Sequence, residues 1–377
     1  MRSSKIAKLP VRMILLSCGV FALMPLRGAV VAQRVGSGGS SVADIRIGVL
    51  GLFHPTEFTV TASGNSALVL RADQEPIVLE KSSGVDSASI RASGNDLKVS
   101  VGRRVVRASK VVVTGRNAQT VDFVLAVPNK IARRYSGTLE IKPSAGTLTA
   151  IVALNRETAV ASVVAAENSP DTPFEALKAQ AVAARSYFVA SPGRHHEFDF
   201  CDTTHCQFLR EPPPPESAAA RAVAATRDLV LAYDSQPIAA MYTRSCSGRT
   251  RIPAELGFSS AAYPYYSVEC QHCRSHPVRW SSRISTADAA TLQTPNESAR
   301  LRIVRRLGWS AVPSNDFIAK KETDHVILNG TGEGHGIGLC QAGARAMAEE
   351  GANFRQVLTR YYPNTAIVRW PGANSIP

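Results

Sequence analysis

Short runs of alternating hydrophobic and polar residues dominate the first part of the chain, and glycine and asparagine residues separate them. A period of two is typical of β-strands with one buried face, so each run predicts a strand. The predicted strands cover residues 46–50, 67–70, 97–101, 110–113, 135–141 and 148–152. The pattern therefore predicts a β-rich N-terminal region over residues 46–134, with two further strands after it.

After residue 156 the hydrophobic period lengthens to that of helices. Thr172 and Glu175 have the spacing of a capping box, and Pro173 takes the first helical position of the helix that they predict. Further helices are predicted over residues 159–166, 216–225, 341–350 and 353–361, and strands over residues 229–233 and 238–243. Strands followed by helices predict an α+β fold, in which a β-rich N-terminal half packs against a helical half that forms a cleft.

The first 32 residues have the pattern of a signal peptide. Four basic residues within the first twelve positions precede an apolar stretch over residues 13–26, and small residues at 30–32 form a cleavage site. We therefore expect an exported protein of the periplasm or cell envelope, which contacts the membrane only through this segment before cleavage. A lipoprotein signal at Cys18 and an uncleaved anchor are the alternatives. Residues 33–45 are expected to form a Gly/Ser linker.

The formal net charge of the chain is +13, and loss of the five basic residues of the signal segment leaves about +8. In an exported protein, this charge favours attraction to an anionic envelope over nucleic-acid binding, although it also serves solubility. We expect no nucleic-acid partner.

The cysteines fall into groups that admit either metal binding or disulfides. His195, His196, Cys201, His205 and Cys206 lie within twelve residues and predict a structural zinc site, with a Cys201–Cys206 disulfide as the alternative in an oxidising compartment.

Three of the remaining cysteines form a second group. For Cys246, Cys270 and Cys273, we expect a disulfide from Cys246 to one of the other two. Cys340 stands at the start of an Ala/Gly-rich helix and is expected to be a buried free thiol.

Glu167 is a candidate general acid. It ends one predicted helix five residues before the cap of the next, and the nearby apolar residues Val163, Val164 and Phe174 are expected to raise the pKa of its carboxyl group. The alternative is an exposed carboxylate at a helix end. No second Asp or Glu stands out as a partner, and this favours a mechanism with one carboxylate.

Two polar turns are candidate binding segments. The four glycines of residues 332–338 surround His335 without the spacing of a P-loop or a dinucleotide fingerprint, so they suit close approach to another ligand, or form a plain turn. Residues 242–248 carry hydroxyl groups and a glycine that suit sugar recognition. A nucleophilic Ser245 or Cys246 is the weaker hypothesis, because no Gly-x-Ser-x-Gly elbow is present.

These segments together resemble the SpoIID/LytB domain family. The resemblance is carried by Glu167, residues 174–187, residues 245–250 and residues 334–344, and it covers residues 135–370. It implies a peptidoglycan lytic transglycosylase, which cuts between N-acetylmuramic acid and N-acetylglucosamine without adding water and prefers glycan without stem peptides. One Glu acts first as acid and then as base.

The resemblance also assigns roles to individual residues. Glu167 is the expected catalytic residue, and Arg185, Tyr187, Ser245, His335 and Gln341 are expected to converge on it. The full set of expected substrate-binding residues is Gln180, Arg185, Tyr187, Tyr242, Ser245, Gly248, His335 and Gln341. The expected zinc ligands are His195, Cys201, His205 and Cys206, because some family members carry zinc on a similar cluster.

The chain departs from the family pattern at two places. Asn168 and Ser169 stand where Met-Pro usually follows the catalytic Glu, and residues 245–249 lack the usual pair of adjacent glycines. The alternative function is therefore a non-catalytic, glycan-binding enhancer of a cell-wall amidase, and a purely structural envelope protein is a third class. The expected partners are peptidoglycan glycan strands and, for the alternative, an amidase.

Overall fold

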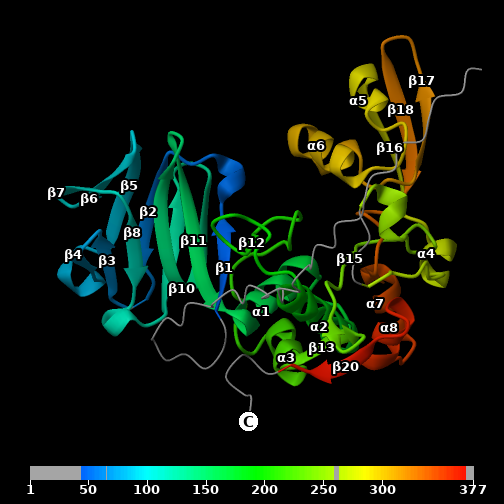
Figure 1. The fold of residues 1–377 in the computed structure, drawn as a ribbon, viewed down its shortest axis with the longest axis horizontal. Coiled ribbons are helices and arrows are strands. Elements are labelled where there is room, and N and C mark those ends of the chain that lie inside the picture. The colour runs from blue at the N-terminus through cyan, green and yellow to red at the C-terminus, as the bar shows by residue number, and fades with distance from the viewer. Residues whose placement is uncertain (1–43, 65, 259–262, 371–377) are drawn as a thin grey trace, which may run out of the picture. The chain divides into compact units, whose positions relative to one another are not determined.

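The computed structural model describes residues 44–64, 66–258 and 263–370 (Figure 1). The expected signal peptide over residues 1–32 and most of the expected linker over residues 33–45 lie outside this part of the chain. Asp44 and Ile45 already belong to the first strand, β1 (Asp44–Val49), so the expected end of the linker at residue 45 is wrong by at least two residues.

A large, curled sheet of mostly antiparallel strands confirms the β-rich N-terminal half and, together with the helices that follow, the α+β fold. Its longest path runs in the order β12-β1-β11-β10-β9-β2-β5-β6-β7, and β8, β3 and β4 extend it from β10. These strands are β2 (Glu57–Ala62), β3 (Leu68–Ala72), β4 (Glu75–Leu79), β5 (Ser87–Ser93), β6 (Asp96–Val101), β7 (Arg104–Ala108), β8 (Val111–Thr114), β9 (Val121–Val127), β10 (Ile131–Ser144), β11 (Thr147–Asn155) and β12 (Phe200–Cys201).

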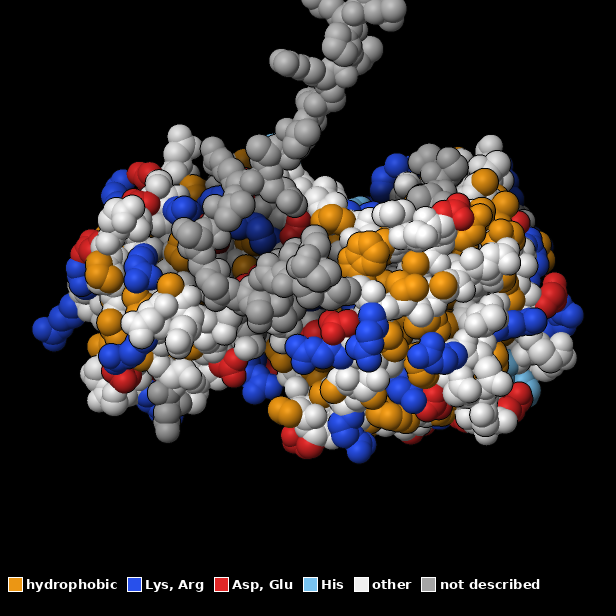
Figure 2. All heavy atoms as spheres, turned by 60° about the horizontal axis from the view of Figure 1, so that its bottom comes forward, with side chains coloured by type: hydrophobic (Ala, Val, Ile, Leu, Met, Phe, Trp, Pro, Cys, Tyr) orange, Lys and Arg blue, Asp and Glu red, His pale blue; other side chains and the backbone are white. Residues whose placement is uncertain are grey.

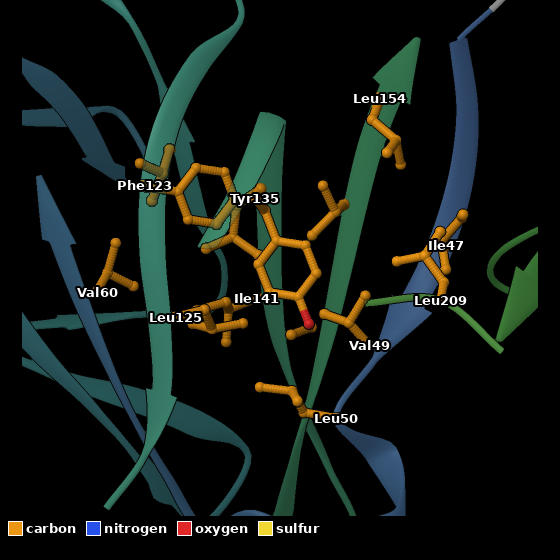
Figure 3. Packing of buried hydrophobic residues seen from close by; sticks show 14 of the residues in the cluster. Ile47, Val49, Leu50, Val60, Phe123, Leu125, Tyr135, Ile141, Leu154 and Leu209 are labelled. Carbon is orange, nitrogen blue, oxygen red and sulfur yellow. The ribbon is translucent and has the colours of Figure 1, made fainter. Parts of the chain in front are cut away.

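The long strand β10 connects the two parts of this sheet. Its first half pairs with β9, and its second half pairs with both β11 and β8. The expected domain boundary between residues 134 and 135 therefore falls inside one continuous strand. The side chains of Phe123 and Tyr135 pack against each other in the interior, with ring centroids 5.9 Å apart (Figure 3).

The sheet shares its hydrophobic core with the first helices. One cluster of buried residues extends from Ile45 in β1 to Val223 and includes side chains from helix α1 (Arg156–Glu167), helix α2 (Phe174–Ala190) and helix α3 (Ala218–Ala225). A continuous core fixes the helix ends against the sheet, because close-packed interiors tolerate little displacement.

Helix α1 is closed at both ends by asparagine side chains. Asn155 accepts a hydrogen bond from the backbone N–H of Glu157 at 2.9 Å, and Asn168 donates to the backbone oxygen of Val164 at 2.9 Å. Asparagine is among the preferred residues at such ends because its short amide satisfies unpaired backbone groups. Asn168 therefore fixes the last turn, which carries Glu167.

The predicted capping box of α2 is wrong. The helix begins at Phe174, Pro173 is the residue before it, and no described side chain caps this N-terminal end. The Thr172 hydroxyl lies 3.2 Å from Ser169 Oγ, whereas Glu175 accepts a hydrogen bond from the backbone N–H of Phe354 at 2.8 Å. A contact with helix α8 (Phe354–Tyr361), which is 179 residues away in the chain, has replaced the local one.

The segments after α3 form two further groups with their own buried clusters. The first contains β13 (Leu229–Tyr233), β14 (Gln236–Pro237), β15 (Tyr242–Thr243), α4 (Gln271–Ser275), β19 (Leu339–Cys340), α7 (Gln341–Glu349), α8 and β20 (Ala366–Arg369). The second contains β16 (Arg279–Ser285), α5 (Thr286–Ala290), α6 (Glu297–Leu307), β17 (Phe317–Lys321) and β18 (His325–Thr331). Short 3-10 helices occupy Gly51–Phe53, Lys81–Ser83, Arg116–Ala118, Pro253–Leu256 and Trp309–Ala311.

The expected strand over residues 238–243 is correct only at its end. Residues 238–241 are not in a strand, because the N–H of Ala240 turns back to the carbonyl of Ile238 at 2.8 Å, and only Tyr242 and Thr243 form β15. Among the described residues, no helix is long and apolar enough to cross a membrane. On the face drawn in Figure 2, basic and acidic side chains are interspersed.

A buried ion pair joins α1 to α2. The guanidinium group of Arg185 is fully buried and makes two hydrogen bonds to the Glu157 carboxylate, at 2.8 and 2.7 Å. It also donates to the backbone oxygens of Leu229 and Val223 at 3.0 and 3.2 Å, and so connects both helices to β13 and α3.

Glu157→Gln is expected to lower the free energy of unfolding by about 3–5 kcal/mol, because it leaves the Arg185 charge buried without a counter-charge. Urea denaturation followed by circular dichroism measures this change. The control is Glu349→Gln, which removes a half-exposed partner of Arg345 and is expected to cost about 0–1 kcal/mol. Equal losses in the two variants would contradict the prediction.

Candidate functional site

Glu167 is the last residue of α1, and its carboxyl group is largely withdrawn from water. Burial raises the pKa of this carboxyl group from 4.5 to about 7, against the opposing effects of the Arg244 charge and of hydrogen bonds from the Gln341 side chain and the Phe208 backbone N–H. A carboxyl group with a pKa near 7 is protonated in a large fraction of molecules at neutral pH. It can therefore donate a proton and accept one back.

Helix α7 holds the backbone around Glu167. Gln341, the first residue of α7, donates from Nε2 to the backbone oxygen of Glu167 at 3.3 Å. Arg345, one turn later, donates to Ser169 Oγ at 3.3 Å and to the Asp171 carboxylate at 2.6 Å. The loop after Glu167 is thus anchored to a helix that follows it by more than 170 residues.

The positive charge of Arg244 lowers the pKa of the Glu167 carboxyl group, against the larger effect of burial. Arg244 follows β15, which pairs in parallel with β19 just before α7. Its Nε lies 2.7 Å from the Glu333 carboxylate, and its side chain is 75% exposed. An exposed guanidinium next to a buried carboxyl can both stabilise the carboxylate and contact an incoming ligand.

Tyr242 is near Glu167, and its phenol is buried. The negative charge of an ionised Glu167 would contribute to the raised pKa of the Tyr242 phenol, but burial is the larger cause. The Tyr242 hydroxyl donates to Gln207 Oε1 at 3.0 Å, and Gln207 donates to the backbone oxygen of Ala184 at 3.1 Å. Gln180 is buried in α2, and its amide atoms have no hydrogen-bond partner in the described part of the chain.

The glycine-rich loop is attached to the turn after β15. Thr243 Oγ1 donates to the backbone oxygen of Glu333 at 2.9 Å and accepts from the backbone N–H of Gly336 at 3.0 Å. Gly334 has a φ of 93°, and a Cβ atom there would lie 2.5 Å from Thr243 Oγ1. Only glycine allows this conformation and this close approach together.

His335 is oriented by its own loop. Its Nδ1 accepts a hydrogen bond from the backbone N–H of Ile337 at 3.0 Å, and burial lowers the pKa of its imidazole. His335 lines a small hollow together with Ser245, Arg251 and Asp316, whereas Glu167 is not part of the lining. Contact between His335 and a glycan stays a prediction, and its expected convergence on Glu167 is not observed.

Several other expected contacts with Glu167 are not observed among the described residues. Arg185 is fully buried and is bound to Glu157, so it cannot reach an external ligand. The hydroxyl of Ser245 faces Cys273, 3.5 Å from its sulfur. The Tyr187 ring packs on Phe200 at 6.0 Å.

Gly248 serves the turn after β15. Its φ is 103°, and its carbonyl accepts a hydrogen bond from the backbone N–H of Cys270 at 2.9 Å. These contacts are internal to the fold. Of the five residues expected to converge on Glu167, the structure brings Gln341 to it, and Tyr242 also lies beside it.

The expected zinc ligands lie together. The ligand atoms of His195, Cys201, His205 and Cys206 are all within 4.8 Å of one another. A sharp turn, in which the N–H of Cys206 bonds to the carbonyl of Thr203 at 3.0 Å, lets the adjacent His205 and Cys206 face the same point. His196 is exposed and outside this group. Two imidazoles and two thiols suit tetrahedral zinc.

This cluster is directly connected to the site of Glu167. Gln207 and Phe208 follow Cys206 in the chain, and they contact Tyr242 and the Glu167 carboxyl respectively. On the other side, Cys201 belongs to β12, which pairs with β1. A metal ion held by the cluster would therefore fix the loop between the sheet and Glu167.

The comparisons with known proteins agree with these features. The model of the family described as "Stage II sporulation protein", abbreviated SpoIID, matches residues 144–233. An uncharacterized protein of Brachyspira hyodysenteriae is 30% identical over 273 residues, which cover 64% of this chain and 74% of that protein. The chain belongs to the SpoIID family.

Two named relatives of this SpoIID family member are more distant. Stage II sporulation protein D of Bacillus amyloliquefaciens is 26% identical over 253 residues, covering 55% of this chain and 72% of the relative. The amidase enhancer of Bacillus subtilis is 24% identical over 275 residues, covering 52% of this chain but only 38% of the relative. The chain thus spans well under half of the enhancer.

The sequence did not single out three residues that surround Glu167 in this SpoIID family member. Arg244 lies within the polar turn over residues 242–248, but the sequence does not indicate that its charge acts on Glu167. Gln207 and Phe208 follow the last zinc ligand, and Phe208 acts through its backbone N–H, which no side-chain pattern can reveal.

The raised pKa of Glu167 predicts a pH-dependent difference in stability. The carboxyl ionises near pH 4.5 in the unfolded chain and near pH 7 in the folded one, so its ionisation opposes folding increasingly between these values and fully above them. Glu167→Gln is expected to match the wild type at about pH 4 and to be more stable by about 1–3 kcal/mol at about pH 8. Denaturant titrations at both pH values measure this, and a difference that is independent of pH would contradict it.

Proposed function

We propose that this SpoIID family member is an exported lytic transglycosylase of the cell wall, which cleaves peptidoglycan between N-acetylmuramic acid and N-acetylglucosamine. The observation that carries the proposal is the carboxyl group of Glu167, whose pKa is raised to about 7 at the junction of α1, α7 and β15. The family membership and the names of the relatives, a sporulation protein and an amidase enhancer, support a role in the cell wall.

The reaction needs one group that works first as acid and then as base. Protonated Glu167 donates its proton to the glycosidic oxygen as the bond from C1 of N-acetylmuramic acid to this oxygen breaks. The resulting carboxylate then takes the proton from the C6 hydroxyl of the same sugar, while O6 forms a bond to C1. The products are a 1,6-anhydro end and a free hydroxyl on the leaving sugar, and Glu167 is again protonated.

The neighbours of Glu167 suit the charged state that forms between these steps. The Arg244 guanidinium, the Gln341 amide and the Phe208 N–H all favour the carboxylate, whereas burial favours the acid. A balance near neutral pH lets both forms be reached during one turnover. The exposed Arg244 is also the group best placed to bind sugar oxygens.

Glu333 is a second carboxylate whose role bears on the choice between this mechanism and hydrolysis. It is the carboxylate that pairs with Arg244, and it would be the natural second carboxylate of a glycoside hydrolase. Because Glu333 forms an ion pair with Arg244, we assign it the role of positioning the Arg244 side chain, and not that of a base that activates water.

The second candidate is a non-catalytic enhancer of a cell-wall amidase. It is favoured by the similarity to the amidase enhancer and by Asn168 and Ser169, which replace the usual residues after Glu167. In that case the same surface binds glycan strands without cleaving them, and the amidase is the partner. Export to the periplasm or cell envelope is part of both proposals and rests on the pattern of residues 1–32.

Structural zinc at His195, Cys201, His205 and Cys206 is also part of the proposal. The dense donor set and its direct connection to Phe208 support it. Zinc there would hold the loop that presents the Phe208 N–H to Glu167, without taking part in the reaction.

Glu167→Gln is expected to reduce cleavage of purified glycan strands without stem peptides by at least about 10²–10⁴-fold, because the amide cannot transfer the proton. Binding of the same strands, measured by sedimentation with insoluble glycan, is expected to persist. The control is Glu333→Gln, which is expected to retain 1,6-anhydro products.

Mass spectrometry of the products decides between the candidates. Anhydro products from the wild type support the transglycosylase. Reducing ends that depend on both Glu167 and Glu333 would indicate a hydrolase. Binding without any cleavage, together with stimulation of an amidase, would indicate the enhancer.

The pH profile gives a separate test of the role of Glu167. Activity requires the protonated acid, so kcat/KM is expected to fall above about pH 7. Arg244→Gln removes a charge that lowers this pKa, and the alkaline limb is expected to move to higher pH. Arg249→Gln, which changes an exposed arginine in the same region that pairs with Glu255, is the control and should leave the limb in place. An unchanged limb in Arg244→Gln would contradict the assignment.

A further inference from the structure

Four cysteines from three separate segments meet in the interior. Cys246 follows β15, Cys270 and Cys273 lie at the start of α4, and Cys340 immediately precedes α7. Their sulfur atoms are all within 4.8 Å of one another, and the Cys273 and Cys340 sulfurs are 3.4 Å apart. Each residue is at most 4% exposed. Cys340 is a buried free thiol, as expected, but it lies beside three other cysteines.

We propose that these four cysteines bind one structural zinc ion, separate from the His/Cys cluster. Zinc lies about 2.3 Å from each thiolate sulfur in a tetrahedral site, which places the sulfurs about 3.8 Å apart. The observed spread from 3.4 to at most 4.8 Å is compatible with such a tetrahedron. The spacing Cys270-x2-Cys273 is also common in structural zinc sites. Binding replaces the four thiol protons, which are released to solvent.

The polar groups around the four sulfur atoms favour ionised thiolates over neutral thiols. The N–H of Gly343 donates to Cys340 Sγ at 3.5 Å, the Ser245 hydroxyl lies 3.5 Å from Cys273 Sγ, and the Tyr361 hydroxyl lies 3.4 Å from Cys270 Sγ. Such outer donors orient metal-bound thiolates and partly neutralise them.

Helix α7 approaches the sulfurs closely at a glycine. A Cβ atom at Gly343 would lie 2.6 Å from Cys270 Sγ, so a side chain there would displace the sulfur. His272 and His276 stack on each other, with ring centroids 5.0 Å apart, and neither belongs to the group. Within the described part of the chain, the four cysteines are the donors grouped at this point.

The proposed zinc would add to the hydrophobic packing that holds a region of short elements. Helix α4 has only five residues, and a helix of that length does not form without tertiary contacts. The ion would tie α4 to the turn after β15 and to the start of α7. Arg244 and Gln341, which act on Glu167, are near neighbours of Cys246 and Cys340 in the chain.

Burial also bears on the choice between zinc and disulfides. Export favours oxidation, and four cysteines this close could instead form two disulfides. However, sulfurs in a saturated zinc site inside the core are shielded from oxidants and exchange partners. A site filled before oxidation is therefore expected to persist, and this inference does not depend on the proposed enzyme activity.

The test uses the full chain purified from its native compartment. The double variant Cys201→Ser/Cys206→Ser removes the His/Cys cluster, and it is expected to retain one zinc per chain by elemental analysis. Replacement of this zinc by cobalt is expected to give the intense visible and near-ultraviolet absorption of a four-thiolate tetrahedral site. Cys273→Ser/Cys340→Ser in the same background is expected to lose that zinc.

X-ray absorption at the zinc edge of the wild type provides a measurement without any variant, and the expected signal includes a component with four sulfur ligands. Two disulfides among the four cysteines, seen as a mass lower by four hydrogens and mapped by peptide analysis, would overturn the proposal. Retention of iron in place of zinc would overturn it as well. Failure here leaves the glycan cleavage assay unaffected, so the two proposals can be separated.

Discussion

The burial of one carboxyl group, that of Glu167, sets the requirements for the rest of the candidate site. A carboxylate at a helix end normally faces water, and here it is covered by groups from α7, from the turn after β15 and from the segment that follows the His/Cys cluster. Burial alone would keep the group protonated, whereas Arg244, Gln341 and the Phe208 N–H favour ionisation. The pKa of about 7 is the result of this balance.

Helix α1 carries a second glutamate, Glu157, which has a structural role. Glu157, in the first turn, is satisfied by two hydrogen bonds from the buried Arg185, and it serves to join helices. Glu167, in the last turn, has no comparable ion pair among the residues that the structure describes, and it keeps its capacity to exchange a proton. The paired Glu157 thus stabilises the fold at one end of the helix. The weakly paired Glu167 remains available for proton transfer at the other end, because it has no strong counter-charge that keeps it ionised.

Each of the two sulfur-containing clusters is close in the chain to residues that act on Glu167. One precedes Gln207 and Phe208, and the other adjoins the turn that carries Arg244 and the start of the helix that carries Gln341. Each lies in a region of short elements and turns. Metal ions at these places would hold the site more firmly than the short elements could alone, because metal binding contributes directly to folding.

Local sequence patterns determined the elements whose signals lie within a few residues. The alternation in residues 46–50 and 148–152 predicted β1 and β11, and the predicted helices over residues 341–350 and 353–361 correspond to α7 and α8. The motif around Glu167 identified the family. The same reasoning failed for the Thr172 capping box, because Glu175 found its partner in α8, and for Arg185, because its distance from Glu157 is set by helix packing. The gathering of Cys340 with three other cysteines, and of Arg244 and Phe208 around Glu167, was decided only by the tertiary structure. Contacts between groups far apart in the chain depend on how whole elements pack, and no local period records them.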